Sequence, residues 1–515
     1  MAKKKSKAER ICVWLLADQL NIGVDSLRGL DPATTQVVMI ESLEHFAGQP
    51  VHKKQLAFTL TAMRHFAQKL RALGWNIYYY AAQPNYNEPL LAHLREYKAK
   101  HLIVMEPADY EMSRFIARIP DWTRVRLEVR PNNLFLLPRK EFARWFRSHK
   151  RRGLPEFYRF MRQRLQLLLT ADGKPQGGQW TFDPPAALPP LPAHFPPLRR
   201  FKPSFTTSEV LEFVRDNFPH FPGDLLPFDW PVTKGQVHQW LMDFLQERLP
   251  HYLNWQEAMV AGQELLYRSH LSAALNNGLL APVEVLQTVL QYYQTHQQKL
   301  SLAALESFLR GLVGSREYSA GLYGVTMPEL RQANPLGLRR SPPEVLRTGH
   351  TEMHCLADIL QRVLHNGYAG DAERRLVLSN FAQLAEVEPA ALAAWFSRVF
   401  VDGAEWAALP QIVGTLPAAG NELPVDGPAV MPAAAIQGCS NFCQSCRYDP
   451  AQLIGEDACP FNFLYWSFLE RHRNQLAELA RFKAAYRQLE RMDNRQRLQI
   501  NRQAEQFLEL RQVKT

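Results

Sequence analysis

Four of the chain's six cysteines lie in one short stretch near the C-terminus, and this stretch constrains the fold more than any other feature. Cys443 and Cys446 form a C-x-x-C pair, Cys439 precedes them, and Cys459 follows with a proline directly after it. A C-x-x-C pair holds two sulfurs on one tight turn, where zinc or an iron–sulfur cluster can bind them. The sequence therefore predicts a metal site here.

The remaining cysteines, Cys12 and Cys355, are distant in sequence, and one distant residue must complete a set of four thiolates. The spacing alone does not choose between Cys439 and Cys443 as a ligand. The absence of a second C-x-x-C and the Cys-Pro ending favour a cluster over zinc. The alternative is a disulfide or unpaired core thiols, which a chain without a secretion signal does not favour.

The net charge indicates which kinds of binding partner the protein favours. The formal net charge is +10 at pH 7, which favours a polyanionic partner, although a basic enzyme that binds no nucleic acid is the alternative. No apolar run approaches the roughly 18 residues of a membrane helix. The basic opening, M-A-K-K-K-S-K, is not followed by a cleavage pattern, so we expect a cytoplasmic protein without membrane contact.

The first part of the chain alternates between apolar strands and helical patterns. Strands are expected at 11–20, 35–42, 75–81 and 101–107, with helices at 55–73 and 90–97. This alternation predicts an α/β domain with a parallel sheet covered on both faces.

Three polar residues stand at the carboxyl ends of these strands, where parallel sheets bind ligands. They are Asp18, Gln19 and Glu41. No glycine-rich fingerprint is present, so a dinucleotide site of the Rossmann type is disfavoured. The alternative for all three residues is helix capping and hydrogen bonding within loops.

The composition changes after the α/β region. A basic and Pro-rich stretch indicates a boundary, and strand patterns end at 235. We expect an α/β domain at 1–135, a connection at 136–230, an all-α domain at 231–480 and a helical tail at 481–515. Helical periods run through 235–247, 255–275, 282–297, 300–313, 353–365, 373–386, 389–400 and 461–512. The polar stretch 470–515 is expected to be a solvated covering helix rather than an arm that binds a partner.

Two stretches of the second half have ligand-binding chemistry. Ser269 and Ser272 are predicted in one helical turn, where hydroxyls and free backbone N–H groups suit a diphosphate, although small residues also pack helices. Arg316 and Glu317 are adjacent and could form a surface ion pair.

Together these segments resemble the iron–sulfur bacterial branch of the cryptochrome/photolyase family, along nearly the whole chain. The motifs that carry the resemblance are L-A-D-Q-L, V-H-K-K-Q-L-A-F-T-L-T-A-M-R-H-F, E-F-Y-R-F-M-R, G-G-Q-W-T-F-D, F-D-W-P-V-T, H-L-S-A-A-L-N-N-G-L-L-A-P, R-E-Y, T-E-M-H-C, S-N-F-A-Q-L-A and C-R-Y-D-P…A-C-P-F-N-F-L-Y-W. The last motif is the most specific.

The resemblance implies the cryptochrome/photolyase fold, a monomer, and an α/β antenna domain followed by an all-α domain that binds FAD. It implies a 4Fe–4S cluster on Cys355, Cys443, Cys446 and Cys459, which leaves Cys439 out. It implies 6,7-dimethyl-8-ribityllumazine as the antenna chromophore at Asp18, Gln19 and Glu41. The implied FAD contacts are Ser269, Leu271, Ser272, Arg316, Glu317 and Asp402, with Trp395 in the electron relay.

The activity implied by the resemblance is that of a lyase, the light-driven repair of pyrimidine (6-4) photoproducts in UV-damaged DNA. Fully reduced, excited FAD donates an electron to a flipped-out lesion, and flipping is least costly where the duplex is already distorted. A basic surface would hold phosphates without reading sequence.

The chain departs from the family at several positions. Gly370 and Asp371 stand where repair members carry two adjacent histidines, one of which donates a proton, and an ionised carboxylate has no proton to give. His365 is the nearest histidine on the N-terminal side. Phe396 and Arg347 replace oxidisable relay residues, and Ser315 replaces a common Trp.

A Pro/Ala-rich segment between Val413 and Gly438 also lacks the Lys-Pro-Tyr of the family. These departures leave three functions open. The first is a (6-4) photolyase. The second is a photoreceptor or DNA-binding homologue that performs no repair, and the third is a scaffold without flavin.

Overall fold

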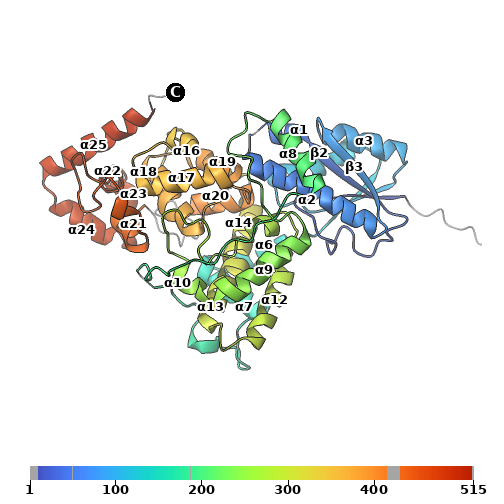
Figure 1. The fold of residues 1–515 in the computed structure, drawn as a ribbon, viewed down its shortest axis with the longest axis horizontal. Coiled ribbons are helices and arrows are strands. Elements are labelled where there is room, and N and C mark those ends of the chain that lie inside the picture. The colour runs from blue at the N-terminus through green and yellow to red at the C-terminus, as the bar shows by residue number, and fades with distance from the viewer. Residues whose placement is uncertain (1–9, 49, 186, 415–429, 513–515) are drawn as a thin grey trace, which may run out of the picture. The chain divides into compact units, whose positions relative to one another are not determined.

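The computed structural model describes residues 10–48, 50–185, 187–414 and 430–512. The chain forms two compact units, each built from several segments (Figure 1). The N-terminal unit contains Met1–Glu141, Arg199–Leu241 and Leu271–Thr288, and the helical unit contains Phe142–Leu198, Met242–His270 and Val289–Thr515. The domain boundaries expected from composition stay predictions.

The N-terminal unit contains a five-stranded sheet with the order β3-β2-β1-β4-β5, and every pair of neighbours is parallel. Its strands are β1 (Ile11–Trp14), β2 (Gln36–Ser42), β3 (Asn76–Gln83), β4 (His101–Met105) and β5 (Arg126–Arg130). The central strand β1 places Val13 opposite Val37 of β2 and Ile103 of β4, all fully buried. The parallel α/β prediction is confirmed, and β5 is a strand that the sequence pattern did not indicate.

Helices complete the N-terminal unit. They include α1 (Leu43–Ala47), α2 (Lys53–Ala72), α3 (Asn87–Glu96), α4 (Tyr110–Ala117), α5 (Ile119–Trp122), α8 (Phe205–Asn217) and α11 (Ser272–Asn276). Helix α2 packs against α8 and ends before Gly74, whose φ of +86° suits glycine at a helix terminus. A buried cluster that includes Trp14, Leu94 and Ile116 joins the sheet to its helices.

Three helices begin in one unit and end in the other, and the helical unit contains the rest. The three are α6 (Arg139–Ser148), α9 (Lys234–Asp243) and α12 (Pro282–Thr295). The others include α7 (Leu154–Arg164), α10 (Tyr252–Trp255), α13 (Leu302–Leu309), α14 (Arg316–Thr326), α15 (Glu329–Gln332), α16 (Val345–Thr348), α17 (His354–Asn366), α18 (Asn380–Leu384), α19 (Pro389–Val399), α20 (Glu405–Gly414), α21 (Ala433–Cys439), α22 (Pro460–Arg471), α23 (Arg473–Leu476), α24 (Lys483–Arg491) and α25 (Asn494–Gln512). The described part of this unit has isolated bridges but no strand, so the all-α prediction is confirmed.

Three π-helical segments interrupt these helices: Phe244–Arg248, Arg310–Ser315 and Glu373–Ser379. Such segments are rare and are often found at functional sites. Two of them lie beside residues to which the resemblance assigns a role, since the second ends directly before Arg316 and the third begins shortly after Gly370.

The helix predicted over 255–275 is wrong. Between α10 and α11 several backbone N–H groups bond to residues outside the segment instead of forming a helical ladder. Ala261 donates to the Asn441 side chain at 2.9 Å, and Gly262 donates to Asp358 at 2.8 Å.

The helix predicted over 461–512 is also not continuous. It breaks into α22, α23, α24 and α25, and α25 packs on α22 with Ile500, Ala504 and Leu508 buried. Much of the Pro/Ala-rich segment, residues 415–429, lies outside the described residues. None of the helices in the described ranges combines the length and apolar character that crossing a bilayer requires.

Candidate functional site

The structure brings four cysteines together around one small cavity. Cys355, Cys443, Cys446 and Cys459 line it, and the rest of the wall is largely apolar. Cys439 is not part of the wall, because its thiol donates to the carbonyl of Ala435 at 3.1 Å within α21. This is the same set of four that the resemblance implies.

Each thiol is positioned by a different local structure. Cys355 lies in the first turn of α17, Cys443 in a 3₁₀ turn, and Cys446 directly after that turn. Cys459 is the N-cap of α22, with Pro460 at the first helical position, where the missing N–H has no cost. The stretch between Cys446 and Cys459 is closed by a bridge that pairs Asp449 with Ala458.

The thiols of the cavity lie close enough to affect one another's charge. Burial raises the pKa of Cys459 to about 12, with a smaller contribution from the neighbouring Cys443 and Cys446. Burial also raises the pKa of Cys355 well above its usual value, again with a contribution from the other three thiols. Both shifts favour the protonated forms of Cys355 and Cys459, so thiolate ligation by these two residues would need positive charge from a metal.

The donor set decides which metal groups suit the cavity. Four thiols, with no histidine among the wall residues, can bind an iron–sulfur cluster or zinc. The residues present therefore fit the cluster that the resemblance implies.

The Arg316–Glu317 pair was expected at the surface, and the structure corrects this. The ion pair is 2.9 Å long, with side chains 10% and 1% exposed. Burial lowers the pKa of Arg316, although Glu317 acts in the opposite direction. The Arg316 guanidinium also lies 5.2 Å from the ring centre of Trp406. A desolvated cation on an aromatic ring is suited to an anionic or flat ligand.

Asp402 belongs to a second buried charge pair. It accepts a hydrogen bond from Arg374 at 2.8 Å, and the Arg374 guanidinium lies 3.8 Å from the ring centre of Phe400. Phe400 in turn contacts Trp395 of α19, with ring centres 6.1 Å apart. The structure thus places Trp395 and Asp402 in one cluster, joined through Phe400 and Arg374.

The predicted serine pair is not formed as expected. Ser272 begins the short helix α11, whereas Ser269 lies in the loop before it, so the two hydroxyls do not share a helical turn. Leu271 is buried and is the N-cap residue of that helix. A helix of five residues is weak support for a diphosphate site.

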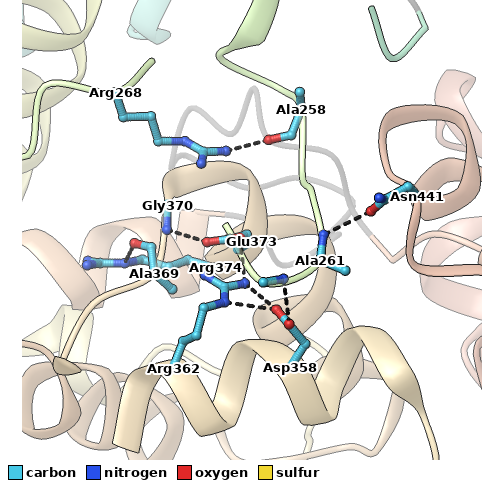
Figure 2. Close-up of polar contacts among 11 residues, drawn as sticks. Ala258, Ala261, Arg268, Asp358, Arg362, Ala369, Gly370, Glu373, Arg374 and Asn441 are labelled. Carbon is cyan, nitrogen blue, oxygen red and sulfur yellow. Dashed lines mark hydrogen bonds and ion pairs between the residues drawn. The ribbon is translucent and has the colours of Figure 1, made fainter. Parts of the chain in front are cut away.

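The position of the expected histidine pair is closed. Gly370 is buried and its N–H donates to Glu373 at 2.6 Å (Figure 2). The side chain of Asp371 is 74% exposed and lies 3.7 Å from Arg375, while His365 is exposed on the last turn of α17. None of these residues supplies a buried proton donor at this place.

A buried network connects this loop to the helix that carries Cys355. Glu373 pairs with Arg362 at 2.8 Å, and Arg362 pairs with Asp358 at 2.8 Å (Figure 2). Asp358 lies one turn after Cys355 on α17. The network and Arg268, which lies against Gly370, were not found by sequence reasoning, because charged residues on an amphipathic helix give the same pattern when they are exposed.

In the N-terminal unit, Glu41 and Gln19 are buried and make hydrogen bonds within the unit. Glu41 accepts from Arg64 at 2.8 Å, from the Tyr79 hydroxyl at 2.6 Å and from the Ala82 N–H at 3.0 Å. The Gln19 amide donates to the carbonyl of Met105 at 3.1 Å. Neither residue lines the cysteine cavity or the pocket beyond the strand ends that is described below.

Asp18 differs from these two residues. It is half-buried, and burial raises the pKa of its carboxyl to about 6, against the opposing effect of a hydrogen bond from the Ala108 N–H. Its charge also acts on Tyr86 and raises the pKa of that phenol further. Asp18 is therefore a predicted antenna residue whose charge acts on Tyr86, which lines an open pocket.

That pocket has a volume of about 750 Å³ and lies beyond the carboxyl ends of β2, β3 and β4, where parallel sheets bind ligands. Its wall combines flat rings with charged groups: His45, Tyr86, Asp109, Arg114, Phe115, Arg118 and Trp122. Asp18, Gln19 and Glu41 are not in the wall. The sequence signal that could have found this pocket is the aromatic content of α4 and α5.

Two solved structures share the fold. A bacterial class III photolyase from Agrobacterium tumefaciens has a TM-score of 0.53 at 15% identity, covering 80% of this chain and 82% of that one. A cryptochrome from Synechocystis sp. PCC6803 has a TM-score of 0.55 at 15% identity, covering 82% and 84%. The chain therefore has the photolyase/cryptochrome fold.

The sequence comparisons define the family more closely. The family described as deoxyribodipyrimidine photo-lyase-related protein matches residues 13–230. A (6-4) photolyase from Agrobacterium fabrum (strain C58 / ATCC 33970) is 31% identical over 502 residues, which are 96% of this chain and 98% of that protein. The chain belongs to the deoxyribodipyrimidine photolyase-related family, as the sequence motifs predicted, and is a flavoprotein of the photolyase/cryptochrome type.

Proposed function

We propose that this protein is a light-dependent DNA-repair flavoprotein of the (6-4) photolyase type. The observation that carries the proposal is the likeness to a (6-4) photolyase over nearly the full length of both chains. The cavity lined by four cysteines supports it, because the same four residues are the ones that the resemblance implies as cluster ligands.

The residues present fit both proposed cofactors of the helical unit. Cys355, Cys443, Cys446 and Cys459 would hold a 4Fe–4S cluster. FAD would contact the buried ion pairs Arg316–Glu317 and Arg374–Asp402, whose guanidinium groups lie on aromatic rings. When bound and fully reduced, the flavin supplies the electron that opens the lesion in the light.

The antenna chromophore would bind in the 750 Å³ pocket of the N-terminal unit. The rings of Tyr86, Phe115 and Trp122 can stack on a flat heterocycle such as 6,7-dimethyl-8-ribityllumazine. Asp18 would act from the edge of this site through its charge on Tyr86. Gln19 and Glu41 would support the strands beneath the site instead of contacting the chromophore.

UV-damaged DNA is the proposed substrate. The formal net charge of +10 supports binding to phosphates without sequence preference. A lesion would enter the site by flipping, which costs less where the duplex is already distorted.

A second function is favoured by the closed histidine position. Gly370 has no side chain, Asp371 points to solvent, and Phe396 is buried in the place of an oxidisable relay residue. Arg347, the other relay replacement, is 75% exposed and pairs with Glu344. These features favour a cryptochrome-like photoreceptor or a DNA-binding homologue that binds flavin without repairing lesions.

One experiment separates these functions. The protein is purified anaerobically, and its iron, sulfide and flavin contents and absorption spectrum are measured before and after blue light with a thiol reductant. It is then incubated in the light with DNA that carries a (6-4) photoproduct or a cyclobutane dimer. Repair of the (6-4) lesion supports the photolyase, whereas photoreduction without repair supports the photoreceptor. A protein with iron and no flavin would reject both.

A further inference from the structure

Arg268 of the helical unit is a buried cation with unmet hydrogen-bonding capacity. The residue is 6% exposed, and its Nη2 donates to the carbonyl of Ala258 at 2.6 Å (Figure 2). Within the described chain, its Nε and Nη1 are buried and have no hydrogen-bond partner. A buried donor without an acceptor is costly, so such a group is expected where a ligand completes it.

No carboxylate of the surrounding loops pairs with Arg268. Three neighbouring arginines each have an acidic partner: Arg362 pairs with Glu373, Arg374 with Asp402, and Arg375 with Glu257. In the described residues Arg268 has no ion pair. The neighbouring carboxylates are thus engaged by other arginines, and within the described ranges Arg268 has no acidic partner of its own.

The guanidinium occupies the space that a side chain at position 370 would enter. A Cβ built on Gly370 would lie 2.4 Å from Cζ and 2.5 Å from Nε of Arg268. The backbone of Gly370 is not in the left-handed region, so its conformation does not require glycine. A side chain at 370 would therefore require the Arg268 guanidinium to move from its position.

The groups on which this charge acts are mostly aromatic. Arg268 acts to lower the pKa values of Tyr252, Tyr368 and Cys439, all of which burial raises. Tyr368 also contacts His270, with ring centres 4.0 Å apart. Aromatic rings next to a desolvated guanidinium are typical of sites that bind a flat ligand with a negatively charged oxygen.

We propose that Arg268 is an oxyanion-binding residue whose ligand is a nucleotide, either the flavin nucleotide or a nucleotide of DNA. The phosphate oxygens or polarised base carbonyls of either source would accept from the free Nε and Nη1. The proposal rests on the flavin and DNA binding proposed above. This role does not require that the protein repair lesions.

The test compares two buried arginines of the same unit. Arg162 is 1% exposed, and its three guanidinium nitrogens donate to the carbonyls of Leu167, Leu168 and Trp180 at 2.6–3.2 Å. Arg162→Met is expected to lower the melting temperature without changing ligand affinity. Arg268→Met is expected to keep the melting temperature within a few degrees of the native value and to weaken nucleotide binding by at least about tenfold.

Two binding measurements distinguish the sources. Flavin content and FAD affinity are measured on each purified variant, and fluorescence anisotropy gives the affinity of the flavin-loaded protein for a photoproduct oligonucleotide and its undamaged counterpart. A loss confined to FAD assigns the flavin nucleotide, and a loss confined to the oligonucleotides assigns DNA. Unchanged affinity for both probes overturns the proposal, as does a fall in melting temperature like that of Arg162→Met.

A second substitution, at Gly370, tests the same contact with Arg268. Gly370→Ala places a methyl group against the guanidinium and should reproduce the binding defect of Arg268→Met. The double variant should lose no further affinity, because both substitutions act on one group. Additive losses in the double variant would mean that Arg268 and Gly370 act separately and would contradict the proposal.

Discussion

Glu41 in the N-terminal unit and Arg268 in the helical unit are both buried charges, but their hydrogen bonding is opposite. Glu41 receives hydrogen bonds from Arg64, Tyr79 and Ala82 and is 1% exposed. Arg268 makes one hydrogen bond and leaves two nitrogens without a partner in the described chain. A charge whose bonds are all made within the protein holds the fold, whereas a charge with unmet bonds is available to a ligand.

The same comparison separates the cysteines. Cys439 donates to a backbone carbonyl within its own helix, as a structural thiol does. The four thiols of the cavity instead share one space, and burial with the neighbouring thiols raises the pKa values of Cys355 and Cys459, which a cationic group would counteract. Substituting a residue whose bonds are all made within the protein should therefore lower the stability of the fold. Substituting a residue whose bonding groups lack a protein partner should reduce the binding of a ligand.

The largest effect is expected at the cysteine cavity. Cys446→Ala removes one thiolate from the set of four, and the protein should lose its iron and much of its soluble yield, because cluster binding is coupled to folding. Iron and sulfide analysis of the purified variant measures this. Cys439→Ala is the matched control in the same stretch, and its iron content should equal that of the native protein.

The outcome that would reject the ligand set is specific. A soluble Cys446→Ala variant with a full iron content would exclude Cys446 as a ligand. A loss of iron in Cys439→Ala would mean that the cavity thiols are not the complete set.

The next largest effect is expected at Glu41. Glu41→Gln breaks a nearly buried ion pair and leaves the Arg64 charge uncompensated, which should lower the free energy of unfolding by about 3 kcal/mol. Denaturant unfolding measures this. The control is Asp216→Asn, since the Arg215–Asp216 pair is exposed and lies outside the pocket wall, and such pairs contribute roughly 0–1 kcal/mol.

An unchanged stability of Glu41→Gln, together with a lost antenna absorption band, would contradict the comparison. Glu41 would then be a chromophore ligand, as the family resemblance implied, and its saturated hydrogen bonds would not be a sign of a structural role.

The amino-acid sequence predicted the fold better than the sites. The parallel sheet followed from apolar runs such as Val37–Met39, because strands buried on both faces leave a continuous signal. The four cysteines were found because the motif around Cys446 and Cys459 is specific. The loop between α10 and α11 was missed, because its stability comes from Asp358 and Asn441, which are distant in sequence.

The candidate site was harder to predict for a related reason. Polar residues at strand ends, such as Glu41, give the same pattern whether their partners are protein groups or ligands. Arg268 and Gly370 are far apart in the chain, and only their packing shows that one fills the space of the other. The glycine at 370, where the resemblance implies a histidine, is visible in the sequence. The Arg268 guanidinium that lies against it is visible only in the structure.

A smaller effect is expected in the pocket beyond β2, β3 and β4. Trp122→Ala removes one ring from its wall and should reduce the co-purified antenna chromophore several-fold while flavin content is unchanged. Trp75 is half-buried just before β3 and is not in the wall, so Trp75→Ala is the control. Absorption and fluorescence spectra of the purified variants measure both pigments. Full chromophore content in Trp122→Ala would exclude this pocket as the antenna site.

The smallest effect is expected from His93 of α3. This side chain is buried, and its charged form would have no acidic partner in the described chain. Burial lowers its pKa to about 4, from an ordinary value of about 6.5 in the unfolded chain. The unfolded state therefore binds the proton more tightly, and the contribution of His93 is complete above pH 6.5 and is lost as the pH falls towards 4.

At pH 5.5 this loss should be about 1 kcal/mol. His93→Phe keeps an aromatic ring against Tyr78 and Tyr97 and should make the stability of the protein less dependent on pH between 6.5 and 4. Denaturant unfolding at pH 8 and pH 5.5 measures the difference, and the pH 8 value serves as the control because the ring is neutral there in both states. An equal pH dependence in the variant and the native protein would mean that His93 is hydrated or paired in solution. Unmet hydrogen bonds in the structure would then not identify the uncompensated buried groups of this unit.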